Sequence, residues 1–90
     1  MNPGTGEATL YEEVVDITHE YLGPAADRFI TRQIRSHLHK NPEELKKRDL
    51  KNLIDWIGLA MSILSEDEEL VHKYIASLNG LAAKNGRRHE

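Results

Sequence analysis

The chain lacks cysteine and long apolar runs, and its first residues do not resemble a secretory leader. With no cysteine among 90 residues, disulfide frameworks, thiolate catalysis and cysteine metal sites are excluded. No apolar run approaches the roughly 20 residues that a membrane-spanning helix needs. The opening MNPGTGEATL lacks the basic start and apolar block of a secretory signal. We therefore expect a cytoplasmic protein that does not bind a membrane.

The sequence also lacks the apolar–polar alternation of β-strands, and it contains no internal repeat. Apolar residues recur instead at three- and four-residue steps, which predicts helices, and 90 residues suffice for one modest core. The prediction is an all-α, compact bundle of four main helices. They are expected at about residues 9–22, 24–39, 49–64 and 66–79, with 42–48 forming either a short extra helix or the start of the third one. The single helical domain should span residues 9–81, between a disordered lead-in at 1–8 and a frayed tail at 82–90.

Local signals indicate several of these boundaries. Gly23-Pro24 should end the first helix and begin the second, because proline fits the first helical position. Ser65 and Glu68 have the spacing of a capping box at the start of the last helix. Asn79-Gly80 should end that helix, because glycine is common just beyond helix C-termini.

The segment DLKNLIDWIGLAMSIL, residues 49–64, is expected to be the helix around which the rest of the chain folds. Its apolar residues form two rows along the helix. The first row, which should face the core, consists of Leu50, Leu53, Ile54, Ile57, Ala60, Met61 and Leu64. The second row, called here the apolar strip, consists of Trp56, Leu59 and Ile63. A helix with this much apolar surface has to be covered on two sides.

Two interpretations of the apolar strip remain open at this point. The first or last helix can cover it, in which case its residues belong to the core. Alternatively the strip stays partly open, and its aromatic and aliphatic side chains serve as anchors of an interface. A homodimer would satisfy the second interpretation, because pairing of two copies would cover the strip.

Charge is distributed unevenly, although the net charge is only −3. Residues 1–27 carry six acidic and no Lys or Arg side chains, whereas residues 28–51 carry eight basic and three acidic ones. Such asymmetry indicates either a patch for an anionic partner or neutralisation between neighbouring helices.

Five basic residues of the middle segment form the predicted basic face. They are Arg28, Arg32, Arg35, Lys47 and Lys51. The three arginines have i, i+4 and i+7 spacing, which places them on one side of a helix. The face is either solvated or salt-bridged, a surface for an acidic protein, or a set of phosphate contacts to nucleic acid. The negative net charge and the lack of aromatic residues between the bases argue against nucleic acid.

The sequence offers no pattern of residues that indicates catalysis or metal binding. His37 and His39 are two residues apart, which points them in different directions on a helix, and no HExxH motif occurs. The paired carboxylates all lie at expected helix starts, where they stabilise the positive helix end. We predict no metal, no cofactor and no enzymatic activity. The expected function is a non-enzymatic protein–protein interaction module of the adaptor or regulatory kind. Its partner is another protein, with an acidic surface facing the basic face, or a second copy. The alternative is a nucleic-acid-binding accessory protein that uses residues 28–51.

Overall fold

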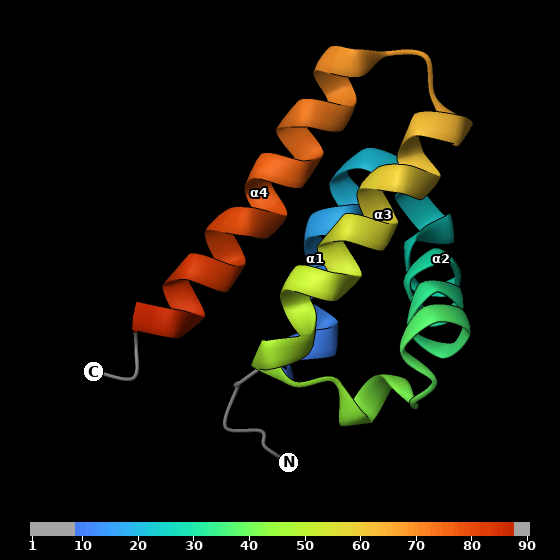
Figure 1. Ribbon diagram of the computed structural model, residues 1–90. Helices are drawn as coiled ribbons and strands as arrows, with labels where there is room; N and C mark the ends of the chain where they lie inside the picture. The colour runs from blue at the N-terminus through green and yellow to red at the C-terminus, as the bar shows by residue number, and fades with distance from the viewer. Residues whose placement is uncertain (1–8, 88–90) are drawn as a thin grey trace.

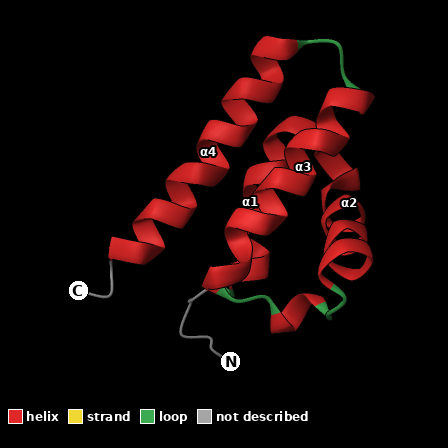
Figure 2. Ribbon diagram, in the orientation of Figure 1, coloured by secondary structure: helices red, strands yellow, loops and turns green. Residues whose placement is uncertain are grey.

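The structure, a computed structural model, describes residues 9–87, with side chains up to residue 83. Every regular element in this range is helical, so the predicted all-α class is confirmed (Figure 2). The predicted lead-in at residues 1–8 lies outside the described residues, as do residues 88–90 of the predicted tail.

Four α-helices run in alternating directions through the molecule (Figure 1). They are α1 (Leu10–Leu22), α2 (Ala26–Gln33), α3 (Leu50–Leu64) and α4 (Glu68–Arg87). α1 packs against α2 and α4, while α3 packs against α4 and against the segment that contains α2. α1 and α3 therefore lie diagonally opposite each other, with α4 and the segment that contains α2 each packed against both. The core lies between these four segments.

The second helical segment differs from the single helix predicted at residues 24–39. It begins with a 3₁₀ turn at Gly23–Ala25, continues as the eight-residue α2, and ends as a π-helical turn at Ile34–Leu38. The expectation of four main helices is therefore wrong for this segment, whereas α1, α3 and α4 are regular helices of 13, 15 and 20 residues. A π turn takes one more residue per turn than an α-helix, and such turns form where tertiary packing requires a shift in side-chain direction.

The short extra helix considered for residues 42–48 is not formed, because this connection consists of two separate 3₁₀ turns. They lie at Pro42–Glu44 and Lys47–Asp49. Between them Leu45 adopts an extended conformation and is buried in the core, with 7% of its surface exposed. Burial of this one apolar side chain explains the break, since the surrounding residues of the connection are polar or charged.

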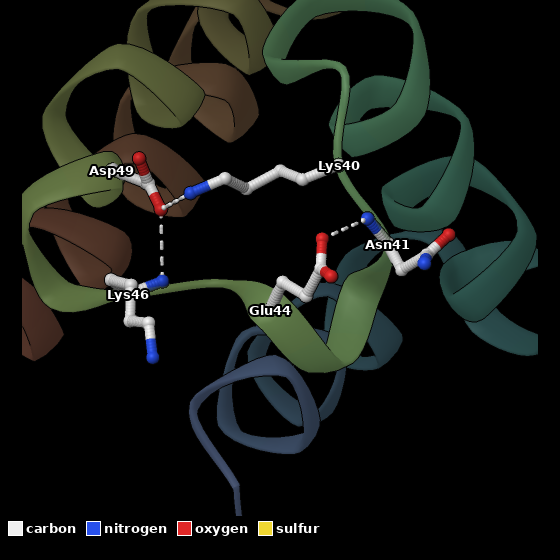
Figure 3. Close-up of polar contacts among 5 residues, drawn as sticks. All are labelled: Lys40, Asn41, Glu44, Lys46 and Asp49. Atoms are coloured by element: carbon white, nitrogen blue, oxygen red, sulfur yellow. Dashed lines mark hydrogen bonds and ion pairs between the residues drawn. The ribbon is translucent and has the colours of Figure 1, made fainter.

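Polar contacts stabilise both turns of this connection (Figure 3). The backbone N–H of Asn41 donates to the carboxylate of Glu44 over 3.1 Å. The carboxylate of Asp49 accepts from the backbone N–H of Lys46 at 2.9 Å and from Nζ of Lys40 at 2.8 Å. Partial burial acts to raise the pKa of Asp49, but the contacts with Lys40 and Lys46 outweigh it and lower this pKa below its ordinary value. The contact between Lys40 and Asp49 joins the end of the second segment to the start of α3.

The buried core confirms that residues 49–64 occupy the centre of the fold. α3 supplies five of the twelve clustered core residues: Leu50, Leu53, Ile54, Ile57 and Met61. The others are Val14, Ile30, Ile34, Leu45, Tyr74, Leu78 and Leu81. The expected inward position of Leu64 is wrong, because 65% of its surface is exposed. Leu64 is the last residue of α3.

Both ends of α4 differ from the predicted 66–79 boundaries. The N-terminal cap is Asp67, whose carboxylate accepts from the backbone N–H of Leu70 at 3.1 Å, so the predicted Ser65–Glu68 capping box is not formed. At the other end the helix continues through Gly80 to Arg87. Leu81 packs into the core with 8% exposure, and this burial offsets the cost of about 1 kcal/mol for glycine inside a helix.

Candidate interaction surface

The outer face of α3 carries a row of apolar side chains that the other helices leave uncovered. Leu59 exposes 56% and Ile63 82% of its surface, while Trp56 is partly buried. Leu64, which follows Ile63 in sequence, extends this exposed surface at the end of the helix. The structure thus favours the open interpretation of the apolar strip over its coverage by α1 or α4.

The packing around α3 explains why the strip remains open. Leu50, Leu53 and Ile57 mark the buried side of the helix, and the strip lies roughly 100–180° around the helix axis from them. One flank of α3 lies against α4, where a Cβ at Gly58 would be in ordinary van der Waals contact with Ile75 Cδ1 at 3.7 Å. The other flank packs against the second segment. The side that faces away from both neighbours carries Leu59 and Ile63.

A stacked pair of rings fixes Trp56 at one end of the strip. The ring of His37 lies parallel to the indole, with 3.8 Å between ring centroids and an angle of 4° between planes. His37 belongs to the π turn, which brings it over α3. The sequence predicted His37 on a regular helix and gave no indication of this contact. A π turn changes the direction of every side chain that follows it, and no sequence pattern indicated a π turn here.

The five residues of the predicted basic face lie on four different elements. Arg28 and Arg32 are exposed on α2, and Arg35 is exposed in the π turn. The i, i+4, i+7 alignment predicted for one continuous helix therefore does not extend to Arg35. Lys47 lies in the 3₁₀ turn before α3, and Lys51 is exposed in the first turn of α3.

The guanidinium groups of Arg28, Arg32 and Arg35 form no ion pair with the residues that the structure describes. Arg28 and Arg32 border a shallow depression together with Asp27 and Thr31. The hydroxyl of Tyr11 on α1 shares a 2.9 Å hydrogen bond with Thr31 there. The depression thus lies where α1 and α2 meet, with two unpaired positive charges at its edge.

The two ends of α3 carry opposite charge. At the start, Lys46, Arg48 and Lys51 are exposed. Beyond the end lies the connection to α4, in which Glu66, Asp67, Glu68 and Glu69 are all exposed. Of these acids, Asp67 already serves as the cap of α4. The apolar strip therefore lies between a basic and an acidic end.

A cleft between the end of α3 and the start of α4 gathers several polar side chains. It is lined by Ser62, Ser65, Glu66, Glu68, Val71 and His72. The Ser62 hydroxyl donates to the carbonyl of Gly58 at 3.0 Å, and the Ser65 hydroxyl accepts from the N–H of Asp67 at 3.1 Å. Both hydroxyls are thus engaged with the backbone.

Neither a metal site nor a membrane-spanning helix occurs in the described part of the chain. No cluster of three or more His, Asp or Glu side chains there has the arrangement of a metal site. No helix within residues 9–87 combines the length and apolar character needed to cross a membrane.

A buried hydrogen bond connects the two helices behind this surface. Thr18 Oγ1 donates to the carbonyl of Val14 at 2.8 Å, so the hydroxyl of Tyr74 acts as the donor in its 2.5 Å bond to Thr18. Burial raises the pKa of Tyr74 to about 12. The bond fixes α4 against α1 and thereby supports the side of α3 that faces the core.

No protein-family model, curated protein or solved structure matches this chain.

Proposed function

We propose that the protein is a non-enzymatic helical interaction module, of the adaptor or regulatory kind, which binds an apolar helix of another protein chain through the apolar strip. The observation that carries the proposal is the exposure of Leu59 and Ile63 next to Leu64. Contiguous large apolar side chains on the surface of a small domain are a feature of interaction sites. Their spacing along one helix suits a helical partner, whose side chains repeat every three to four residues.

Trp56 is suited to act as the anchor of such an interface. Tryptophan is enriched among the residues that contribute most to binding energy. The stack with His37 holds the indole in one orientation, so little side-chain freedom is lost when a partner binds. An acidic patch on the same partner would also fit Arg28 and Arg32, which form no ion pair with the described acidic side chains.

Site-specific photo-crosslinking in cells that naturally produce the protein tests this proposal. A benzophenone amino acid replaces Ile63 in one variant and Asp16, an exposed residue of α1, in a matched control. We expect a covalent adduct with another chain from position 63 and none from position 16. Adding Leu59→Lys should remove the adduct while leaving the circular dichroism spectrum unchanged. Equal labelling from both positions, or none from position 63, would contradict the proposal.

The second candidate function is nucleic-acid binding by residues 28–51, which the exposed and unpaired Arg28 and Arg32 favour. Phosphate contacts strengthen as salt is lowered, so DNA and RNA oligonucleotides should bind measurably at low ionic strength. The double variant Arg28→Glu with Arg32→Glu should lose this binding, whereas Lys73→Glu on the exposed side of α4 should retain most of it. Absence of binding at low salt would eliminate this candidate.

A further inference from the structure

The charges at the ends of α3 restrict which helix can lie along the apolar strip. Arg48, in the turn before α3, and Lys51, in its first helical turn, are both exposed. They precede Asn52, which continues the line of Trp56 and Leu59 by one helical turn. Beyond the other end, Glu66 is exposed in the connection after Ser65, and Glu68 and Glu69 are exposed in the first turn of α4. A helix that matches this surface needs an apolar centre, an acidic end beside Arg48 and a basic end beside Glu66.

α3 itself has that pattern, in the reverse direction. We infer that the partner is a second copy of this chain, with its α3 packed antiparallel along the apolar strip about a two-fold axis near Leu59. The inference rests on the proposed function, since it names the partner of the same strip. Asn52 lies seven residues before Leu59, about 10 Å along the axis of α3, and the acidic residues lie just beyond Leu64, where α3 ends. The two-fold axis therefore brings the basic end of each copy level with the acidic end of the other.

The direction of pairing follows from electrostatics. In a parallel pair, the two basic ends would lie together and so would the two acidic ends, and like charges in contact oppose association. A two-fold axis also makes the contact self-complementary and closed, because each copy presents the same patch to the other. Asp55, exposed beside the strip, lies at the edge of the antiparallel contact and remains solvated. The contact is small, so we expect a weak dimer.

The first test measures molar mass by light scattering for the wild type and for variants in which the charges at one or both ends of α3 are reversed. Wild-type protein should pass from monomer to dimer between about 1 μM and 1 mM, the range expected of small interfaces. R48E/K51E and E66K/E69K should each weaken the dimer by about tenfold or more, because four contacts become repulsive. All four substitutions in one chain should restore it, because the polarity is then inverted and complementary again.

A mixing experiment strengthens this test. Combined in equal amounts, R48E/K51E and E66K/E69K should form a heterodimer that is tighter than either homodimer, because acidic ends then meet basic ends. A wild-type protein that stays monomeric at the highest concentration would overturn the inference. Charge reversals that leave the dimer unchanged would overturn the antiparallel arrangement.

Because the chain contains no cysteine, engineered disulfides report the direction of pairing. Leu59→Cys should cross-link two copies under mild oxidation, since position 59 lies near the axis. Asn52→Cys alone should not, because its two positions would be about 20 Å apart, too far for a disulfide. A mixture of Asp55→Cys and Ile63→Cys should give the mixed disulfide, because both positions lie on α3 four residues from Leu59. Efficient self-cross-linking of Asn52→Cys would show a parallel pair instead.

The mass of the photo-adduct from position 63 separates this inference from the proposed function. An adduct of twice the monomer mass supports both. An adduct with a different protein, from a chain that is monomeric in solution, supports the proposed function and overturns the inference. Absence of any adduct together with a monomeric mass overturns both.

Discussion

His39 ends the second helical segment in the left-handed region of backbone conformation, with φ of 56° and ψ of 41°. A side chain with a Cβ is disfavoured there by roughly 1–2 kcal/mol, and glycine is the residue most often found just beyond a helix end. The sequence carries no glycine at this position, so this conformation could not be predicted from it. The connection that begins with Lys40 and Asn41 requires the turn.

Replacing His39 with glycine should therefore stabilise the fold. The expected gain in the free energy of unfolding is about 0.5–1 kcal/mol, because the relief of backbone strain exceeds the added flexibility of the unfolded chain. Urea denaturation followed by circular dichroism measures it. His39→Ala serves as the control and should give no gain, since alanine keeps the Cβ; an equal gain for both variants would show that strain is not the cause.

Tyr74 should make stability depend on pH in the alkaline range. Below pH 10 its hydroxyl is protonated in both the folded and the unfolded chain. Burial raises the pKa of Tyr74 to about 12 in the fold, so between pH 10 and 12 the unfolded chain releases the proton first and stability falls as pH rises. The loss should reach about 2–3 kcal/mol by pH 12.

The variant Tyr74→Phe isolates this contribution. It should be less stable at neutral pH by about 1 kcal/mol, because Thr18 loses a buried hydrogen-bond donor. Urea denaturation at neutral pH and again between pH 10 and 12 should show a smaller fall with rising pH in Tyr74→Phe than in wild type. Parallel curves for the two proteins would mean that Tyr74 does not titrate in the predicted way.

At the scale of elements, the sequence predicted long regular helices well and irregular segments poorly. α1 and α3 lie within one residue of their expected boundaries, because their apolar periodicity and their breaks are both local. The second segment and the end of α4 were missed for a different reason. The second segment depends on the stack of His37 on Trp56, two residues that are distant in sequence. The end of α4 depends on the burial of Leu81, which lies beyond the apparent stop signal at Asn79-Gly80.

Gly80 lies inside α4, although the sequence predicted that the helix would end there. Nothing lies within 4 Å of a Cβ placed there, and its φ is not in the left-handed range. Gly80→Ala should therefore stabilise the protein by about 0.5–1 kcal/mol. Gly23→Ala is the contrasting variant: with φ of 66° and ψ of −144°, it should cost about 1–3 kcal/mol. Both values come from thermal or urea unfolding, and a destabilising Gly80→Ala would mean that the helix ends at that glycine.

At the scale of the whole molecule, α3 has one face that maintains the fold and another that is available for binding. Met61 exposes 1% of its surface and Ile63 82%, although they are only two residues apart. Met61→Ala should cost about 2–5 kcal/mol, because it leaves a cavity in the core. Ile63→Ser should change stability by no more than about 0.5 kcal/mol while abolishing concentration-dependent association. Comparable destabilisation by both variants, measured on monomeric samples, would show that the strip is part of the core.

The sequence by itself determined the helical class, the central position of residues 49–64 and the composition of the apolar strip and the basic face. These follow from periodicity and spacing, which are properties of neighbouring residues along a helix. Only the tertiary structure decided that the strip is open, that Trp56 stacks on His37 and that the basic residues are divided among four elements. Exposure depends on which helices fill the space around α3, and that depends on the directions the chain takes at Gly23, in the π turn and at the buried Leu45.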